Sequence, residues 1–515
     1  MLVKTFSAAM MGLEATTITI EVNLSRGMQF HLSGLADTAV KESYDRIRAA
    51  MSNIGFKPPS AAITINLSPA DIRKEGTGYD LPLAIGILAA HGKVSETNLN
   101  DYMMIGELGL DGKLKPVNGI LPVSILARRE KFKGLIVPLE NAREAAVVNN
   151  LDVYGMENLA DVISFFNGCE NYEPTVVNTR QEFFEQQSAF DLDYADVKGQ
   201  ESVKRALEVA AAGGHNIIMI GPPGSGKSMM AKRLPGILPP LSLSESLETT
   251  QIHSIAGLLP AGTSLISQRP FRSPHHTVSQ VAMTGGGNRA MPGEVSLAHN
   301  GVLFADELPE FNKSTLEVLR QPLEDRKITI SRAKYTVEYP CSFMFVASMN
   351  PCPCGYYGDP THHCVCTPGQ IQRYMNKISG PLLDRIDLHC EIANVPFAEL
   401  SKMAPGEPSE KIRERVIKAR QIQEERYKDY KGTYCNAQMS ERMIHLYAEP
   451  DAASMDMLRV AIERLKLSAR AYSRILKVAR TIADLAGSEK VESMHIAEAI
   501  GYRSLDRGDW AERGI

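Results

Sequence analysis

The chain lacks three features: a long hydrophobic run, a cysteine-dense scaffold and a strong excess of either charge. No uninterrupted apolar stretch reaches membrane-spanning length, so the sequence predicts no transmembrane helix. The amino terminus carries one lysine and a very short apolar patch before Glu14, which does not make a signal peptide. Eight cysteines in 515 residues argue against a disulfide scaffold and favour a reducing, cytoplasmic environment.

The near balance of charge limits which partners the whole surface can attract. The formal net charge is −4, so the protein as a whole is not a basic nucleic-acid binder. Any DNA contact must therefore come from a local patch. A length of 515 residues allows about three domains, and an apolar content of 44% is ordinary for globular protein.

The most informative segment begins with the apolar residues 217–220, which are typical of a buried strand. They run into the spacing of a nucleoside-triphosphate P-loop, made of Gly221, Pro222, Pro223, Gly224, Ser225, Gly226, Lys227 and Ser228. In such a loop the glycines let backbone N–H groups surround the β-phosphate, the lysine neutralises phosphate oxygens, and the final hydroxyl holds Mg²⁺. The alternative is a plain glycine-rich turn, but the strand, loop and following helix all match the P-loop context. The sequence therefore predicts a site for ATP and Mg²⁺.

Two later strands supply polar groups of the kind this site needs. Residues 300–307 read as a short apolar strand that ends in two carboxylates, Asp306 and Glu307. We expect Asp306 to lie beside Mg²⁺ and Glu307 to polarise the attacking water. Residues 343–350 form a third strand that ends in Asn350, which can orient the water or the γ-phosphate. A turn-forming asparagine before Pro351 is the alternative for that residue.

The order of these motifs resembles the AAA+ ATPases. Segments 269–277, 292–301 and 380–388 are similar to the magnesium-chelatase-like branch. From the first residue to about residue 510, the chain resembles the bacterial ComM/YifB competence-associated family. The resemblance implies an α/β and α+β multidomain fold with a Lon-type/S5-like amino-terminal domain, a P-loop AAA+ α/β core and a carboxy-terminal helical lid.

Domain boundaries follow from this resemblance and from shifts in composition. We expect the Lon-type domain at 1–167, a linker at 168–192, the ATPase core at 193–397 and the lid at 398–515. Segment 74–81 has no serine where Lon-type proteases carry their nucleophile, and Leu121 stands at the place of the catalytic lysine. We therefore expect a non-proteolytic domain with a structural or DNA-positioning role.

The resemblance also implies an active site completed across a subunit boundary, where a neighbour's arginine stabilises the transition state. Arg385 matches the position of that arginine finger, although it could instead pair with Asp384 or Asp387. Arg470 matches the second sensor of the lid, and Arg474, one helical turn later, is its rival. These assignments imply a homo-oligomer, most simply a hexamer.

Two segments carry basic residues that can grip a substrate. Segment 326–338 alternates as a β-hairpin, with Arg332 and Lys334 at or near its tip. Basic residues on a hairpin that faces a pore contact phosphates without reading sequence, and the alternative is a solvated surface hairpin. Segment 267–291 combines Arg269, Arg272, His275, His276 and Arg289. The DNA-contact candidates are Arg272, Arg332 and Lys334.

Four cysteines lie close together in residues 352–366, a candidate zinc knuckle: Cys352, Cys354, Cys364 and Cys366. Four thiolates so close in sequence can converge on one tetrahedral Zn²⁺. The Cys-x-Cys spacing is less common than Cys-x2-Cys, and four reduced, metal-free cysteines are the alternative. Because the cluster directly follows Asn350, a metal there would brace the sensor loop structurally.

Taken together, these features predict an ATP-driven, ring-forming DNA motor. The family resemblance favours a branch-migration helicase that acts on single-stranded or branched DNA, without sequence preference, in homologous recombination and natural transformation. The alternative is a magnesium-chelatase-like remodeller that acts on a protein partner. An ATP-dependent protease is disfavoured by the missing serine and lysine.

Overall fold

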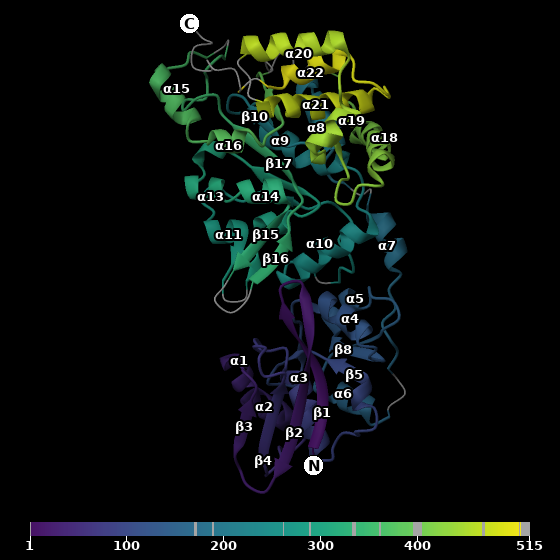
Figure 1. Ribbon diagram of the computed structural model, residues 1–515. Helices are drawn as coiled ribbons and strands as arrows, with labels where there is room; N and C mark the ends of the chain where they lie inside the picture. Colours follow the sequence, from purple (N-terminus) through teal and green to yellow (C-terminus); the bar gives the residue numbers. More distant parts are fainter. Residues whose placement is uncertain are drawn as a thin grey trace. The chain divides into compact units, whose positions relative to one another are not determined.

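The strand-forming segments of the chain gather into two separate main sheets (Figure 1). The computed structural model describes residues 2–168, 172–187, 190–260, 262–287, 290–331, 336–359, 362–394, 404–465, 469–503 and 505. One unit comprises Met1–Glu185 and Leu243–Ser267, and the other comprises Gln186–Ser242 and Gln268–Ile515. Each unit is therefore built from two segments of the chain.

The first unit contains a seven-stranded sheet in the order β3-β4-β2-β1-β5-β8-β9. β1, β2 and β4 pair antiparallel, whereas β5, β8 and β9 join the sheet as parallel strands. Its strands are β1 Leu2–Met11, β2 Glu14–Ser25, β3 Phe30–Ser33, β4 Ala62–Ser68, β5 Tyr102–Met104, β8 Gly134–Pro138 and β9 Asp152–Met156. A separate pair is formed by β6 Glu107–Leu108 and β7 Leu114–Lys115. The β-branched alternation around residues 16–22 and 61–67 thus forms β2 and β4.

Helices complete the core of this unit. All eleven residues of α3, Asp80–Ala90, are buried, which explains why the helix is almost wholly apolar. The other helices are α1 Thr38–Lys41, α2 Ser43–Asn53, α4 Ile120–Arg129, α5 Ala142–Ala145, α6 Leu159–Phe166, α7 Thr179–Gln186 and α10 Leu243–Ile255. α7 lies within the segment whose composition predicts a linker, and its Phe183 is buried.

Helix α10 follows the P-loop in sequence but packs in the first unit. The Ser254 hydroxyl donates to Glu144 Oε1 at 2.5 Å, and the Gly119 N–H donates to the Ser254 carbonyl at 3.1 Å. Glu144 also accepts from the N–H of Leu121, the residue at the place of the Lon-type lysine. Leu121 is fully buried, and burial raises the pKa of the Glu144 carboxyl. Helix α10 therefore contacts Glu144, the residue that hydrogen-bonds the backbone of Leu121.

The second unit contains a five-stranded, all-parallel sheet in the order β11-β14-β17-β10-β18. Its strands are β10 Ile217–Ile220, β11 Phe271–Arg272, β14 Val302–Ala305, β17 Met344–Met349 and β18 Leu388–Glu391. β10, β14 and β17 are buried throughout, as the apolar runs in the sequence predict. Because the sheet is parallel, the carboxyl ends of β10, β14 and β17 lie at one edge.

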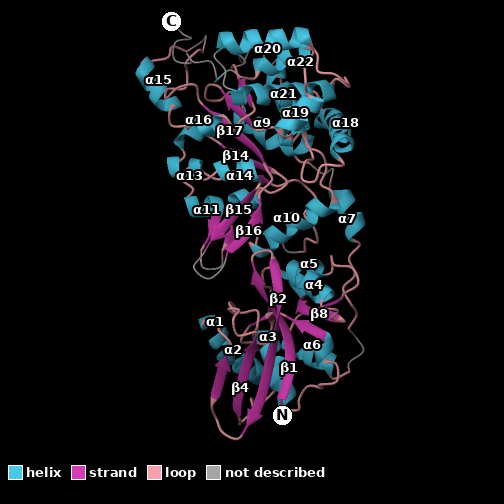
Figure 2. Cartoon of the chain, viewed as in Figure 1, coloured by secondary structure: helices cyan, strands magenta, loops and turns pink. Residues whose placement is uncertain are grey.

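Two antiparallel hairpins extend this unit: β12 Gly285–Gly286 with β13 Met291–Pro292, and β15 Lys327–Ser331 with β16 Thr336–Pro340. Figure 2 shows helices around the sheet and through the carboxy-terminal part. These helices are α8 Glu201–Gly213, α9 Lys227–Arg233, α11 Gln280–Thr284, α12 Glu294–Leu297, α13 Lys313–Glu317, α14 Arg320–Asp325, α15 Pro368–Met375, α16 Gly380–Leu383, α18 Ser409–Tyr427, α19 Glu441–Tyr447, α20 Ala452–Leu465, α21 Ala469–Leu485 and α22 Ser493–Gly501. In the described part of the chain, no helix has the length and apolar character that crossing a bilayer requires.

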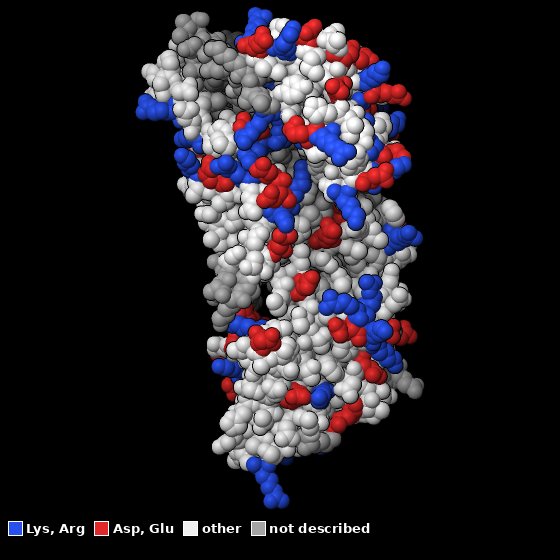
Figure 3. Space-filling view, viewed as in Figure 1, with Lys and Arg blue, Asp and Glu red and all other residues white. Residues whose placement is uncertain are grey.

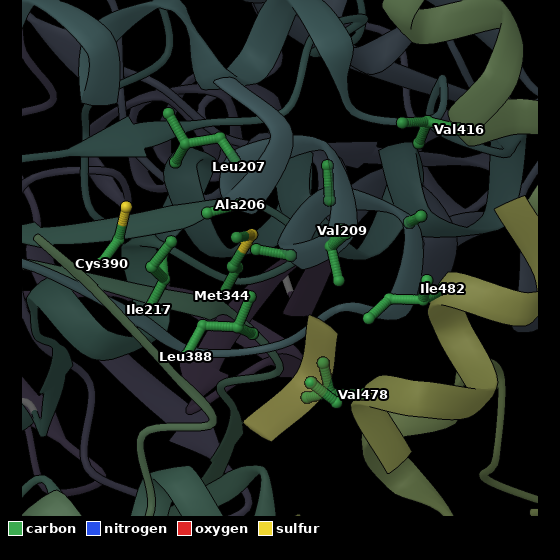
Figure 4. Packing of buried hydrophobic residues seen from close by; sticks show 14 of the residues in the cluster. Ala206, Leu207, Val209, Ile217, Met344, Leu388, Cys390, Val416, Val478 and Ile482 are labelled. Atoms are coloured by element: carbon green, nitrogen blue, oxygen red, sulfur yellow. The ribbon is translucent and has the colours of Figure 1, made fainter. Parts of the chain in front are cut away.

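The core of the second unit is centred on α8. Residues of this helix contact β18 on one side and α18 and α21 on the other. Figure 4 shows Leu207 and Val209 of α8 among side chains from the sheet, such as Ile217, and from the carboxy-terminal helices, such as Val416 and Ile482. The carboxy-terminal helices therefore share one apolar core with the five-stranded sheet.

This shared core makes a stability prediction. Leu207 is fully buried, so Leu207→Ala removes apolar contacts and leaves a cavity, at a cost of about 2–5 kcal/mol in unfolding free energy. We expect a clearly lower midpoint of denaturant unfolding, measured by circular dichroism. The matched control is Leu446→Ala, because Leu446 lies on a helix of the same unit but is exposed. Equal midpoints for the two variants would contradict the packing described.

Candidate nucleotide-binding site

The P-loop connects buried strand β10 to helix α9. Gly224 and Gly226 have φ angles of +79° and +88°, in the left-handed region that favours glycine. Helix α9 begins at Lys227, directly after the loop. The segment thus has the strand, loop and helix context that phosphate binding at a helix amino terminus requires.

Lys227 is buried inside this loop. Its Nζ donates to the carbonyl oxygens of Gly221 at 2.7 Å and Pro222 at 2.9 Å, and to Asn350 Oδ1 at 3.3 Å. Burial lowers the pKa of the ammonium group, and the nearby carboxylates of Asp306 and Glu307 oppose that shift. The lysine therefore connects the P-loop to the strand-end asparagine, and a bound phosphate would take over its donors.

A hydroxyl and a carboxylate meet where Mg²⁺ would bind. Ser228 Oγ donates to Asp306 Oδ2 at 2.7 Å. The second oxygen of Asp306 accepts from the hydroxyl of Ser348, on β17. Ser348 was not singled out from the sequence, and its position two residues before Asn350 on the same strand is the signal that could have found it. The donor set of serine hydroxyl and carboxylate suits a hard cation.

Glu307 lies at the turn that follows β14, with φ of +54°. Its N–H donates to Ser348 Oγ at 3.3 Å, and its side chain is about half exposed. His276 Nδ1 lies 3.7 Å from Glu307 Oε2. The sequence placed His276 among substrate-gripping residues, whereas the structure places it beside the candidate catalytic base.

A cavity of about 220 Å³ adjoins the P-loop. It is lined by two groups of residues, one in the loop and α9 and one before α8, together with one residue after β18: Gly224, Ser225, Gly226, Met229, Met230, Asp196, Val197, Lys198, Gln200 and Asn394. The hydroxyl of Ser225 is buried without a hydrogen-bond partner in the described part of the chain. A buried, unpaired hydroxyl in a phosphate-binding loop fits a site made for a polar ligand.

The candidate arginine finger and the two candidate sensor arginines each form an ion pair with a carboxylate of the same chain. Arg385 pairs with Glu324, not with the neighbouring aspartates, and also donates to the Pro381 carbonyl at 2.7 Å. Arg470 pairs with Asp384 at 2.9 Å and is largely exposed. These contacts do not test the sensor and finger roles, which stay predictions.

The rival sensor Arg474 is part of a buried ion pair. It lies 2.6 Å from Asp387, whose other oxygen is 3.1 Å from His215 Nδ1. Burial raises the pKa of the Asp387 carboxyl, but Arg474 and His215 outweigh burial and hold that pKa well below its usual range. Arg474 therefore has a structural partner that ties α21 to the start of β18.

The DNA-contact candidates differ in what the structure places around them. Arg272 lies on edge strand β11, and two of its nitrogens each donate to Glu294 at 2.7 Å. The Glu294 carboxylate raises the pKa of the Arg272 guanidinium, against the effect of burial. A DNA phosphate would have to replace this carboxylate. Arg332 and Lys334 lie outside the described residues, between β15 and β16.

The four cysteines of residues 352–366 converge. Their sulfur atoms all lie within 4.8 Å of one another, and Cys352 is fully buried. Burial raises the pKa of the Cys354 thiol, but backbone hydrogen bonds from Tyr356 and Val365 outweigh it and lower the pKa to about 6. Burial and the neighbouring cysteines raise the pKa values of the Cys364 and Cys366 thiols, so Cys354 alone of these three favours the thiolate form that binds metals.

The parallel sheet, the P-loop, the two acids after β14 and the asparagine after β17 define a P-loop nucleotide-binding protein of the AAA+ class. Family models of magnesium chelatase match most of the chain. "Magnesium chelatase, subunit ChlI" matches residues 193–400, "Subunit ChlI of Mg-chelatase" matches 20–141, and "Magnesium chelatase, subunit ChlI C-terminal" matches 406–503.

Full-length relatives narrow this class. The chain is 44% identical over 504 residues to competence protein ComM of Haemophilus influenzae, covering 98% of this chain and 97% of ComM. It is 43% identical over 504 residues to the YifB protein of Escherichia coli, covering 97% of this chain and 96% of YifB. The chain therefore belongs to the ComM/YifB family of magnesium-chelatase-like proteins.

A partial similarity accompanies this family match. The chain is 31% identical over 120 residues to Lon protease 2 of Bacillus subtilis, which covers 23% of this chain and 20% of that protease. The expected combination of a Lon-like amino-terminal part, an AAA+ core and carboxy-terminal helices is confirmed.

The geometry of Lys227 makes a direct prediction about nucleotide binding. Lys227→Ala removes the buried ammonium that the P-loop pattern predicts to neutralise the phosphates, so ATP affinity should fall by at least about tenfold. Fluorescence titration with a labelled ATP analogue measures the change. Lys232→Ala is the control, because Lys232 lies on the same helix but is exposed. Equal affinities for the two variants would show that Lys227 does not contact the nucleotide.

Proposed function

We propose that the chain is an ATP-hydrolysing, ring-forming DNA motor, a branch-migration helicase for homologous recombination and natural transformation. The observation that carries the proposal is the meeting of Lys227, Ser228, Asp306 and Asn350 at one sheet edge, in a member of the family that includes competence protein ComM. The proposed cofactors are ATP and Mg²⁺, with one Zn²⁺ at the four-cysteine cluster.

The chain's own groups divide the work of hydrolysis. Lys227 and the P-loop N–H groups bind the phosphates, and Ser228 with Asp306 would hold Mg²⁺, which supplies charge neutralisation when bound. Glu307 takes the proton of the attacking water, and Asn350 orients that water or the γ-phosphate. Ser348 positions Asp306, because its hydroxyl donates to the carboxylate.

Assembly into a ring, most simply a hexamer, would complete the site. Arg385 lines a groove of about 780 Å³ together with Glu324 and Arg320. Its Nε is buried without a partner in the described part of the chain, so the guanidinium keeps hydrogen-bonding capacity beyond its pairing with Glu324. We propose that a neighbour's nucleotide draws Arg385 from Glu324, and that Arg470 on α21 senses the nucleotide of its own subunit.

DNA contact is assigned to the hairpin of β15 and β16. The two strands pair antiparallel over five residue pairs, and the basic residues Arg332 and Lys334 come between them in the sequence, outside the described residues. Figure 3 shows basic and acidic side chains interspersed over the face in view, in keeping with contact through a local element rather than a broad basic surface. Such contacts to phosphates are independent of DNA sequence.

A second candidate is an ATP-driven remodeller of a protein partner. The magnesium-chelatase family models that match along the chain favour it. In this case the hairpin would contact polypeptide, and DNA would leave the rate of hydrolysis unchanged.

ATP turnover measured without DNA, with single-stranded DNA and with a mobile four-way junction tests the proposal. We expect DNA to stimulate turnover and the junction strands to separate. Glu307→Gln should lower turnover at least about 100-fold while ATP binding is retained, because only proton removal from water is lost. ATP turnover that is unchanged by DNA would favour the protein remodeller. A Glu307→Gln variant that hydrolyses ATP at the normal rate would show that Glu307 is not the catalytic base.

Subunit mixing tests the role of Arg385. Arg385→Ala should lower turnover by about a thousandfold, because a neighbour's arginine stabilises transition-state charge. Mixing this variant with Glu307→Gln should restore part of the activity, since the second variant supplies Arg385 to an intact site. A mixture of Lys227→Ala and Glu307→Gln is the control and should stay inactive. No recovery in the first mixture would mean that Arg385 acts within its own chain.

A further inference from the structure

The four-cysteine cluster has the dimensions of a tetrahedral metal site. Cys352 Sγ lies 3.3 Å from Cys354 Sγ and 3.7 Å from Cys364 Sγ, and the sulfurs of Cys354 and Cys364 are 3.5 Å apart. Four sulfurs at about 2.3 Å from one Zn²⁺ would be about 3.8 Å from one another. The observed separations are far from a disulfide bond, and all four cysteines are free.

The ligand set points to a soft, thiophilic cation. All four groups are sulfur, and such a set selects Zn²⁺ over the oxygen-seeking Mg²⁺. The two histidines nearby are exposed, and His362 stacks on Tyr356 with ring centroids 4.8 Å apart. The cluster therefore needs no histidine to complete four ligands, and a closed four-sulfur set is typical of structural sites.

The same loop touches the P-loop at Gly355, one residue after Cys354. Gly355 has a φ of +88°, and a Cβ placed there would lie 2.6 Å from Pro223 Cδ. No side chain fits between the Gly355 backbone and the Pro223 ring without displacement. The cysteine loop therefore packs directly against the segment that surrounds the phosphates.

A second contact joins the loop to the other side of the nucleotide cavity. The Asn394 side chain donates to Asp359 Oδ2 at 3.2 Å, and the Asp359 carboxylate is almost fully buried. Asn394 lines the 220 Å³ cavity together with Ser225 and Gly226. Residues on both sides of the cavity are thus held by one loop.

The chain connection supplies a third constraint. Asn350 precedes the first cysteine by two residues, and its Oδ1 accepts from Lys227. The carbonyl of Met349, the last residue of β17, accepts from the Gly221 N–H at 3.2 Å. A shift of the cysteine loop would therefore act on the sensor asparagine, the P-loop and Asn394 together.

We propose that the four thiolates bind one Zn²⁺ ion and that this ion fixes the loop against the nucleotide cavity, so that ATP affinity depends on metal occupancy. Metal binding offsets the conformational entropy that is lost when the cysteine loop is ordered. The inference rests on the proposed binding of ATP at the P-loop.

The first test uses the full-length protein purified from zinc-replete cells. Elemental analysis should find about one zinc per chain, and titration with a fluorescent ATP analogue should give the reference affinity. After removal of metal with a thiol reagent and chelator, affinity should fall by at least about tenfold, and added Zn²⁺ with reductant should restore it. Circular dichroism monitors whether the metal-free protein stays folded.

Variants separate the metal from its mechanical effect. Cys364→Ser with Cys366→Ser should lose the zinc and weaken ATP binding. His363→Ala, an exposed change in the same loop, should leave both unchanged. Asp359→Ala should keep the zinc but weaken ATP binding, because it removes the hydrogen bond from Asn394 and one from the His362 N–H, while all four thiols stay in place. This variant tests the link between the cysteine loop and the nucleotide cavity even where metal removal unfolds the protein.

Each negative result overturns a different statement. If the protein takes up no zinc, even when Zn²⁺ is added to the reduced form, the proposed metal site is wrong. If the protein binds zinc but its ATP affinity is unchanged by both metal removal and Asp359→Ala, the proposed dependence of ATP affinity on the metal is wrong. A zinc-loaded wild-type protein that binds no ATP would instead overturn the proposed nucleotide function.

Discussion

The parallel alignment of β10, β14 and β17 is the constraint on which the candidate site depends. Parallel strands place their carboxyl ends at one sheet edge, so residues far apart in sequence meet there. Ser228 reaches Asp306, and Lys227 reaches Asn350, only through this alignment. The strands can hold it because they are buried on both faces, with helix α8 packed between the sheet and the carboxy-terminal helices. The apolar core and the polar site are therefore two consequences of one sheet.

A buried carboxylate couples the carboxy-terminal helices to this sheet. Asp387, just before β18, is held by Arg474 of α21 and by His215, just before β10. A buried charge is tolerated only when it is paired and hydrogen-bonded, so these partners are required and fix how α21 meets the sheet. Asp384, three residues earlier, pairs with Arg470 of the same helix. The segment that carries Arg385 is thus tied twice to the helix that carries the candidate sensor, which gives a physical route between the position of α21 and Arg385, the proposed arginine finger.

How far the site could be predicted depended on whether its signal was local. The P-loop and the Asp-Glu and Asn strand ends were visible, because each is a short motif that follows an apolar run. Ser348 and His276 were missed in their present places, because contacts with Asp306 and Glu307 are made across strands and not along the sequence. Arg272 looked free in a basic segment, yet it pairs with Glu294, 22 residues away. A charge in sequence does not reveal whether the fold supplies its partner.

The sequence alone determined the class of protein and the chemical groups of the site, because strand–loop–helix context and residue type are encoded within a few neighbouring positions. It also identified four cysteines close enough to share one ion. Only the tertiary structure decided that α10, inserted after the P-loop, packs around Glu144 in the first unit. It alone brought the cysteine loop against Pro223 and Asn394. These outcomes depend on contacts between distant segments, where burial and shape complementarity select the partner, and no local pattern records that selection.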